Sequence, residues 1–412
     1  MANKDRTKIN IVKDTQFLFI DMNAFFASCE QQTNFNLRHK PVAIAPYKGN
    51  TGCIISPSYE AKAYGVKTSM LVKKAKEICP NIIILESNVS MYLNIHHEIK
   101  KILFSFSPFV KILSVDEAVI FLSPSEQKTE LAFNIARKIK NAIYQKIGKC
   151  MRSSIGIGPS IYLAKQASEI EKPNGLQEIK IKDIPNYLSK ISLTDLKGIN
   201  TRMKIRFNNL GIYTPLDLYN TPVQNLREKL GIVGEYWYLL LRGKDITNFN
   251  TCEKSIGHSH VLEPKYRKWD FAWSVCQKLI SKAGYRLRKT GLTAGGVYLQ
   301  VNCFNKYSFH KAFKTRSFAD DFAFNRYIKF LFQQIDKSYK PIRVAVGLFN
   351  LSKNNSFQND LFLKNYKNKL IYDIVDKINN KYGAFTIKSS SILLADDSAP
   401  NRISFGRPDN NF

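Results

Sequence analysis

The stretch Gln16-Phe17-Leu18-Phe19-Ile20-Asp21 is a short apolar run that ends in a carboxylate. A second apolar run, residues 111–122, carries Asp116 and Glu117 in its middle. Both runs are rich in β-branched and aromatic residues, which is the pattern of strands buried on both faces. An isolated ionised carboxylate is costly inside a sheet, whereas strand ends and bends open onto clefts. We therefore predict that Asp21, Asp116 and Glu117 meet across two neighbouring strands and hold divalent cations.

Two points stand against that prediction. Each acid on its own could simply cap a turn. Consecutive strand residues also point to opposite faces, so Asp116 and Glu117 share one site only if the chain bends there or if one of them has another role.

Three carboxylates brought together without a cation would repel one another. Oxygen ligands with no nearby Cys or His favour Mg²⁺ or Mn²⁺ over Zn²⁺.

The composition indicates a folded protein with a polyanionic partner. A chain of 412 residues is long enough for roughly two to four domains. Its formal charge is +29, spread along the whole chain, which favours nucleic acid as a partner and makes an anionic membrane surface the second choice. No apolar run is long enough to span a membrane, and the N-terminus is polar. The seven cysteines are scattered without a CxxC pair, so we expect no disulfide framework or structural zinc and a cytoplasmic location.

Residues 52–65 predict a short helix after a strand. Ser56 suits the N-cap, Pro57 the first helical position and Gly65 the C-terminal cap. Tyr59 and Lys62 would then share one face. A helix N-terminus with a hydroxyl and an amine beside it can bind phosphate, although many short surface helices share this pattern.

Further along, apolar spacing predicts helices over 92–109 and 129–147, and 153–160 is typical of a strand, a glycine turn and the N-cap Ser160. This GxG lacks the third glycine of a dinucleotide fingerprint, and no GxxxxGK[ST] occurs, which excludes Rossmann and P-loop sites. Turns near Gly198 and Gly211 join short helices and expose N–H groups suited to phosphate. Residues 255–352 predict a basic α+β module with strands at 255–262, 293–303 and 341–351 and helices at 269–288 and 322–338. Beyond 353 we expect a loose tail that is helical around 370–382.

Taken together, residues 15–352 resemble the bacterial Y-family (DinB/UmuC-like) translesion DNA polymerases. The resemblance rests on four motifs in order. They are Ile20-Asp21-Met22-Asn23-Ala24-Phe25-Phe26-Ala27-Ser28-Cys29-Glu30, then Ser58-Tyr59-Glu60-Ala61-Lys62-Ala63-Tyr64-Gly65-Val66-Lys67, then Ser114-Val115-Asp116-Glu117-Ala118, and finally Ser154-Ile155-Gly156-Ile157-Gly158-Pro159-Ser160 with Leu163-Ala164-Lys165 and Lys172-Pro173-Asn174-Gly175.

The resemblance implies an α+β, multidomain right-hand polymerase with a ferredoxin-like palm. The implied parts are a palm (1–24 and 88–188), fingers (25–87), a helix-hairpin-helix thumb (189–248), a linker (249–254), an α+β little finger (255–352) and a tail (353–412). The implied activity is template-directed, error-prone translesion synthesis, in which deoxynucleotides are added to a primer 3′ end by two-metal phosphoryl transfer. The implied partners are primer-template DNA, dNTPs and accessory SOS proteins, in a cytoplasmic, nucleoid-associated setting.

The same resemblance assigns roles to individual residues. Asp21, Asp116 and Glu117, with the Met22 carbonyl, would hold two Mg²⁺ ions, which Mn²⁺ could replace, and the paired acids would sit at a β-hairpin bend. Phe26 would be the steric gate under the sugar, with Phe25 beside it. The implied triphosphate contacts are Ser56, Tyr59, Lys62 and Lys172. The implied DNA contacts are Lys197, Gly198, Asn200, Gly211, Arg286, Arg288, Lys314 and Arg316.

The chain departs from the family pattern at three positions and adds one motif. Asn23 stands where many relatives have a third acid, at a position that is not a principal metal ligand. Lys62 replaces an Arg of some relatives, which trades a bidentate fork for a point charge. Asn200 replaces a hairpin glycine, which we attribute to the ease with which Asn enters the left-handed region. In the tail, Gln358, Leu361 and Phe362 form a motif similar to the QxxLF peptide that docks bacterial polymerases on the sliding clamp.

Two other classes of protein share some of these features. A two-metal nuclease would use similar acids but would need a water-activating base and no triphosphate site. A catalytically silent DNA-binding relative would keep the basic regions but should have lost an acid, and all three acids are present here.

Overall fold

The computed structural model describes residues 13–47, 49–246, 254–353 and 364–400. They fall into two compact units, one made by the described residues up to 246 and the other by those from 254 to 400. Each unit is described by itself. None of the helices in the described ranges is both long enough and apolar enough to cross a membrane.

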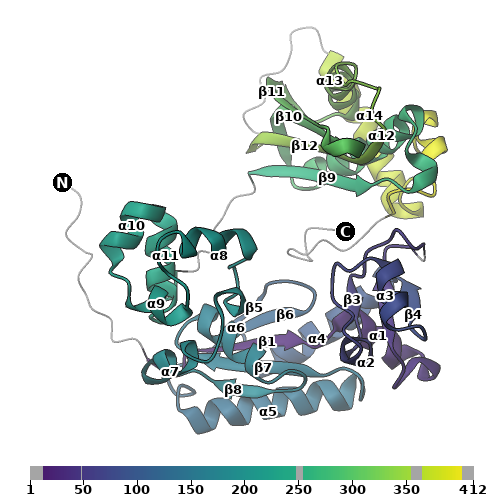
Figure 1. Cartoon of the computed structure of the whole chain (residues 1–412). Coiled ribbons are helices and arrows are strands. Elements are labelled where there is room, and N and C mark those ends of the chain that lie inside the picture. The colour runs from purple at the N-terminus through teal and green to yellow at the C-terminus, as the bar shows by residue number, and fades with distance from the viewer. Residues whose placement is uncertain (1–12, 48, 247–253, 354–363, 401–412) are drawn as a thin grey trace. The chain divides into compact units, whose positions relative to one another are not determined.

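The first unit is built on a five-stranded sheet in the order β5-β6-β1-β7-β8 (Figure 1). Its strands are β1 (Phe17–Met22), β5 (Val110–Ile112), β6 (Glu117–Phe121), β7 (Ser153–Gly158) and β8 (Leu176–Glu178). The central strand β1 is antiparallel to β6 and β7 and buried along its whole length, as its apolar run predicts.

Helices cover both faces of this sheet. The helices α4 (Val89–Phe106) and α5 (Thr129–Lys146) pack on the face that contains Leu18 and Ile20. The helix α6 (Ile161–Ile170) packs on the opposite face, against Phe17 and Phe19. Ser160 caps α6 as predicted, because its hydroxyl accepts a hydrogen bond from the Leu163 N–H at 3.2 Å. The sheet with its helices matches the predicted palm.

The run predicted over residues 111–122 is two strands joined by a tight hairpin. The N–H groups of Leu113 and Ser114 both donate to the Glu117 carbonyl, at 2.9 and 3.2 Å. Asp116 lies in the turn and Glu117 begins β6. The chain therefore bends at the paired acids, so alternation along a strand does not separate them.

A smaller sheet in the order β3-β2-β4 lies beside the first. Its elements are α1 (Phe25–Thr33), η1 (Phe35–Leu37), β2 (Val42–Ala45), β3 (Ser56–Pro57), α2 (Tyr59–Ala63), α3 (Val72–Ile78) and β4 (Ile83–Glu86). The predicted N-cap Ser56 is wrong, because Ser56 and Pro57 pair with β2 and the cap is Ser58. Gly65 has the positive φ expected of a residue that ends a helix.

Short helices complete the first unit around a core that contains Phe207 and Trp237. They are η2 (Ile181–Asp183), α7 (Ile184–Leu188), η3 (Leu193–Asp195), α8 (Thr201–Asn208), α9 (Pro215–Asn220), α10 (Val223–Leu230) and α11 (Ile232–Leu240). Gly198 and Gly211 have φ of +100° and +77°, so glycine is needed in both turns. Our explanation of Asn200 is wrong: its φ is −92°, and its side chain caps α8.

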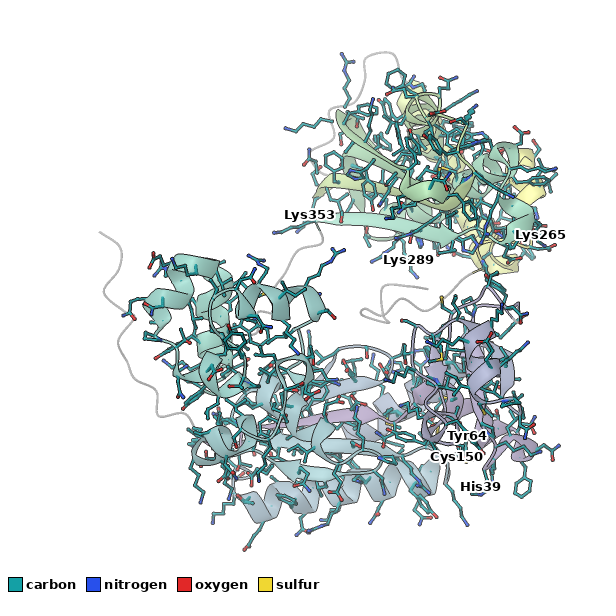
Figure 2. All side chains as sticks on the ribbon, in the orientation of Figure 1. His39, Tyr64, Cys150, Lys265, Lys289 and Lys353 are labelled. Carbon is teal, nitrogen blue, oxygen red and sulfur yellow. The ribbon has the colours of Figure 1, made fainter. Side chains whose placement is uncertain are left out.

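The second unit has a four-stranded antiparallel sheet in the order β11-β10-β12-β9. Its elements up to residue 353 are β9 (Ser255–Val261), η4 (Pro264–Tyr266), α12 (Trp269–Lys289), β10 (Leu292–Cys303), η5 (Phe304–Lys306), β11 (Ser308–Phe318), α13 (Asp321–Phe332) and β12 (Pro341–Lys353). The sequence did not indicate β11, because this edge strand carries mostly exposed polar and basic side chains. Lys265, Lys289 and Lys353 project from the surface of this unit (Figure 2).

The tail that we expected to be loose beyond residue 353 is part of this second unit over its described residues. The helix α14 (Lys364–Tyr382) is followed by η7 (Ser390–Ala395), and Ala395 and Ala399 join the core beneath α12. The Lys278 ammonium donates to the Asp396 and Ser398 carbonyls, both at 2.6 Å. The predicted linker, apart from Lys254, and the motif of Gln358, Leu361 and Phe362 lie outside the described residues.

Candidate active site

The end of β1 and the β5–β6 hairpin bring three acids together. Asp21 is paired with Glu117 across the sheet, and the Met22 N–H donates to the Asp116 carbonyl at 2.8 Å. Burial raises the pKa of Asp116, and the nearby Glu117 and Asp21 carboxylates raise it further, while a hydrogen bond from the Ser114 hydroxyl opposes the shift. The paired acids thus lie at a hairpin bend beside Asp21.

Two lysines neutralise these acids. The Lys165 ammonium contacts Asp21 Oδ2 and lies 2.6 Å from Glu117 Oε1, and the Lys172 ammonium lies 3.0 Å from Asp21 Oδ1. Burial alone would lower the pKa of Lys165, but the Asp21 and Glu117 carboxylates more than offset it and hold the pKa above its ordinary value. We did not single out Lys165 from the sequence, although it lies within the fourth motif.

The acids fit a divalent metal by their chemistry, but they are not arranged as a ready cage. Across the described ranges, no three His, Cys, Asp or Glu side chains gather closely enough to hold a metal ion. The reason is local: Lys165 holds Asp21 and Glu117 about its own ammonium, while the Ser114 hydroxyl contacts Asp116. Carboxylate oxygens without Cys or His are the donors that Mg²⁺ and Mn²⁺ prefer. The Lys165 ammonium lies at the position where Asp21 and Glu117 stabilise a positive charge.

A fourth acid, Glu169 on α6, joins three lysines. Its carboxylate lies 2.9 Å from the Lys172 ammonium, 3.3 Å from that of Lys165 and 3.2 Å from that of Lys197. Burial would raise the pKa of Glu169, but these lysines outweigh it and lower the pKa to about 2. The sequence analysis missed Glu169, although Lys165, Glu169 and Lys172 follow the i, i+4 and i, i+3 spacing of ion pairs on a helix.

Two of the predicted nucleotide contacts face the same acids. The Lys62 ammonium lies 4.3 Å from the centre of the Tyr59 ring. The pKa of Tyr59 is raised to about 12 by burial and by the Asp21 and Glu169 carboxylates. Burial and the Lys172 ammonium lower the pKa of Lys62, against the pull of the same two acids. The Tyr59 and Lys62 side chains of α2 are therefore within electrostatic reach of Asp21 at the end of β1.

The other predicted nucleotide contacts differ in their surroundings. Phe25 is in the core, whereas Phe26 is half-buried and stacks on Tyr92 with ring centres 4.6 Å apart. Ser56 lies in β3, two residues before the helix cap. The structure thus leaves Phe26, and not Phe25, partly open at the start of α1.

One predicted DNA contact is wrong. The Arg288 side chain is only 7% exposed, and its guanidinium lies 2.6 Å from both the Asp321 and the Asp376 carboxylate, which ties α12 to α13 and α14. Among the other predicted contacts in this unit, Arg286 is half-buried on α12, and Lys314 and Arg316 are exposed on β11. Arg288 is therefore a structural residue.

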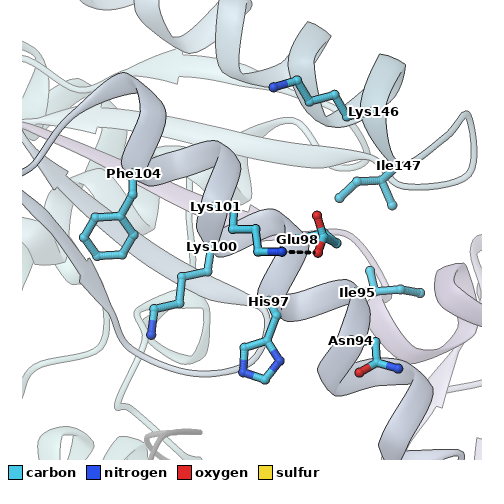
Figure 3. A pocket seen from close by; sticks show the side chains of 9 residues that line it. All are labelled: Asn94, Ile95, His97, Glu98, Lys100, Lys101, Phe104, Lys146 and Ile147. Atoms are coloured by element: carbon cyan, nitrogen blue, oxygen red, sulfur yellow. Dashed lines mark hydrogen bonds and ion pairs between the residues drawn. The ribbon is translucent and has the colours of Figure 1, made fainter.

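A cavity of about 820 Å³ lies apart from the acids, on the outer side of α4 (Figure 3). Its walls come from α4 and the end of α5 and mix apolar with charged groups, among which Lys101 and Glu98 form an ion pair at 2.7 Å. The lining residues are Asn94, Ile95, His97, Glu98, Lys100, Lys101, Phe104, Lys146 and Ile147. None of the acids at the end of β1 belongs to it.

Comparisons with known proteins agree with the fold and identify the family. Residues 20–169 match the model of the impB/mucB/samB family, and residues 253–361 match the model of its C-terminal domain. The chain is 31% identical to DNA polymerase IV of Pelotomaculum thermopropionicum, an alignment that covers 90% of this chain and 93% of that protein. It is 29% identical to DNA polymerase IV of Moorella thermoacetica, over 90% and 95% of the two chains.

Solved structures show the same architecture. A Y-family DNA polymerase chimera of Dbh and Dpo4 matches 82% of this chain and 100% of its own, with a TM-score of 0.72 and 24% identity. DinB from Sulfolobus solfataricus matches the same shares, with a TM-score of 0.53 and 24% identity. The fold is thus that of a right-hand polymerase. The chain belongs to the impB/mucB/samB family, as a DinB-like Y-family DNA polymerase.

Proposed function

We propose that this polymerase extends a primer 3′ end with deoxynucleotides on damaged as well as undamaged templates, with low fidelity. The observation that carries the proposal is the meeting of Asp21, Asp116 and Glu117 at the end of β1, with Tyr59 and Lys62 in electrostatic reach of Asp21. A polymerase needs acids for metal ions and cations for a triphosphate at one place, and this site supplies both. The relatives called DNA polymerase IV support the assignment.

The proposed chemistry assigns a task to each side chain. Asp21, Asp116 and Glu117, with the Met22 carbonyl, would hold two Mg²⁺ ions, and Mn²⁺ could take their place. When bound, such ions lower the pKa of the primer hydroxyl and neutralise the leaving phosphates. Lys165 balances the charge of Asp21 and Glu117 and holds these two acids close together.

On the nucleotide side, Lys62 and Lys172 would neutralise the charge that develops on the pyrophosphate, and the Tyr59 hydroxyl would donate to it. Ser56 would add a hydroxyl contact. Phe26, held by stacking on Tyr92, would exclude a ribose 2′-hydroxyl. Phe25 would support Phe26 from the core.

We further propose how the parts divide the work. Residues 1–24 and 88–188 would form the palm, 25–87 the fingers and 189–248 the thumb. The described residues from 255 to 353 and from 364 to 400 would form the little finger, which extends the expected 255–352 by the packed part of the tail. DNA would contact backbone N–H groups in the thumb turns and basic side chains of the little finger. These contacts are Lys197, Gly198, Asn200, Gly211, Arg286, Lys314 and Arg316.

The short fingers segment supports the low-fidelity part of the proposal by analogy with the family, in which such fingers leave a pocket that is open and tolerates damaged bases. Gln358, Leu361 and Phe362 would dock the polymerase on the bacterial sliding clamp, and accessory SOS proteins could assist it. Changing these three residues to Ala should remove stimulation by the clamp while clamp-free synthesis persists. Clamp stimulation that survives the change would show that the motif has no such role.

Primer extension with Mg²⁺ on damaged and undamaged templates tests the proposed function. The wild-type protein should extend both, whereas Asp116→Ala and Glu117→Ala should lose extension and keep DNA binding. Glu98→Ala is the matched control, since Glu98 is an exposed acid on the outer side of α4. Normal extension by Asp116→Ala would refute the site. Shortening of the primer would instead favour a nuclease, and binding without extension by the wild-type protein a silent relative.

A further inference from the structure

The loop of residues 172–175, which carries Lys172, is held by buried side chains that have no part in the site described above. One of them is Asn23, which follows β1 and is only 2% exposed. Its amide oxygen accepts a hydrogen bond from the Asn174 N–H at 2.7 Å, and its amide nitrogen donates to the Ser154 hydroxyl at 3.0 Å. The Ser154 hydroxyl in turn accepts from the Gly175 N–H at 3.2 Å. Two consecutive N–H groups of the loop are thus anchored to the ends of β1 and β7.

The carbonyl groups of the same two residues are held from the other side. The Lys140 ammonium, on α5, donates to the Asn174 carbonyl and to the Gly175 carbonyl, the latter at 2.9 Å. Lys140 therefore spans from a helix on the far side of the sheet to the loop. Hydrogen bonds from a charged donor are stronger than those between neutral groups.

The loop depends on these hydrogen bonds because its own sequence determines the shape of the turn but not the position of the turn relative to Asp21. Asn174 has a φ of +64°, which Asn tolerates, and a Cβ on Gly175 would lie 1.9 Å from the Glu171 carbonyl oxygen. These features make the turn tight. Its distance from Asp21 depends on the contacts of Asn23, Ser154 and Lys140.

We propose that Asn23 and Lys140 are positioning residues that clamp this loop and so hold the Lys172 ammonium in place for the incoming triphosphate. The proposal rests on the proposed function, in which Lys172 meets the triphosphate. These contacts give Asn23 a structural role of its own, which is to hold the loop of residues 172–175. An amide there anchors the loop without adding a fourth negative charge beside Asp21, Asp116 and Glu117.

The alternative is that Asn23 is simply a satisfied buried amide whose loss lowers stability. The two ideas differ in what they predict for catalysis by protein that still folds. A residue that acts through Lys172 should change the KM for dNTP more than kcat, because Lys172 would bind the triphosphate in the ground state before it neutralises the pyrophosphate in the transition state. A purely structural residue should lower the fraction of active protein and leave KM unchanged.

The test compares steady-state insertion of one nucleotide by folded variants. Asn23→Leu removes all the hydrogen bonds of the side-chain amide, and the KM for dNTP should rise by about tenfold or more. Asn23→Asp should restore most of the loss despite its added negative charge, because a carboxylate still accepts from the Asn174 N–H and from the Ser154 hydroxyl, which donates to the Asn23 amide oxygen at 3.3 Å. Lys140→Met, which acts from the far side of the loop, should raise KM by about threefold or more. DNA affinity, measured by fluorescence anisotropy, should stay as in the wild-type protein.

The matched control is Lys138→Met, an exposed lysine on the same helix, for which KM should not change. Lys172→Ala separates the two levels of the argument. If Lys172→Ala leaves KM unchanged, the proposed role of Lys172 fails. If Lys172→Ala raises KM while folded Lys140→Met and Asn23→Asp both behave as the wild-type protein and Asn23→Leu loses only stability, the clamp is wrong and the proposed function stands. Asn23→Asp as impaired as Asn23→Leu would also overturn the clamp.

Discussion

Replacing Lys165 by Met tests whether the acids at the end of β1 depend on a cation. The Lys165 side chain is 17% exposed, Asp21 10% and Glu117 31%, so the cluster is mostly but not fully buried. Removing one partner of a buried ion pair costs about 3–5 kcal/mol, whereas an exposed pair contributes about 0–1 kcal/mol. Lys172 still pairs with Asp21 at 3.0 Å in the variant. One carboxylate can also take up a proton, which limits the loss.

We therefore expect Lys165→Met to lower the free energy of unfolding of the first unit by about 2 kcal/mol, between the buried and exposed limits. For a unit of this size the melting temperature should fall by roughly 4–8 °C. The assay is thermal unfolding at pH 7, first with EDTA and then with excess Mg²⁺. Mg²⁺ should raise the melting temperature more in the variant than in the wild-type protein. In the wild-type protein the ion must compete with the Lys165 ammonium for the acids, whereas in the variant it need not.

The matched control is Lys101→Met, which removes an ion pair of similar length, at 2.7 Å, whose side chains are 72% and 58% exposed. Its free energy of unfolding should change by less than about 0.5 kcal/mol. The reasoning about Lys165 is refuted if Lys165→Met and Lys101→Met have the same melting temperature in EDTA. It is refuted equally if Mg²⁺ raises the melting temperature of the variant and of the wild-type protein by the same amount.

Three further outcomes follow from the contacts described. Phe26→Ala should raise ribonucleotide insertion by about tenfold or more, since a pocket discriminates by shape; unchanged sugar selection would show that another residue is the gate. Arg288→Ala should destabilise the second unit by about 3 kcal/mol in urea unfolding, because it leaves Asp321 and Asp376 unpaired. Arg316→Ala should leave stability alone and weaken DNA binding; the reverse pattern would contradict both assignments. Glu169→Gln should be less stable than the wild-type protein at pH 7. The pKa of Glu169 is lowered from 4.5 to about 2, so the stabilisation by its carboxylate is present above pH 4.5 and is lost as the pH falls through 2. The difference in stability between the wild-type protein and Glu169→Gln should therefore shrink across that range. A difference that stays constant would contradict the ion pairs.

The sequence predicted the centre of the site because its local signals are strong. An apolar strand with a terminal Asp21 and a second run broken by Asp116 and Glu117 can place their carboxylates at few positions other than an edge or a bend. The hairpin itself did not follow from the residues, since alternation along a single strand would have separated the paired acids. It took backbone hydrogen bonds to the Glu117 carbonyl to show the bend.

Other errors arose where distant residues decide the outcome. Ser56 and Ser58 are equally good caps, and Pro57 favoured Ser56 on local grounds, but pairing of Ser56 with Ile44 placed it in a strand. Arg288 was taken for a DNA contact because charge alone does not reveal a partner. Its partners Asp321 and Asp376 lie 33 and 88 residues further along the chain. Lys165 and Glu169 were within reach of the helical spacing rule, which we did not apply to the fourth motif.

The acids and lysines of the site can lie close together because their charges balance. Asp21, Asp116, Glu117 and Glu169 are four carboxylates, and Lys62, Lys165, Lys172 and Lys197 are four ammonium groups in their ion pairs or electrostatic reach. The two sets balance within the protein. The negative charge of a triphosphate roughly matches that of two divalent cations, so a nucleotide that arrives with its metal ions preserves the balance. A nucleotide or metal ions alone would upset it. Binding of the nucleotide and binding of the metal ions should therefore be mutually dependent.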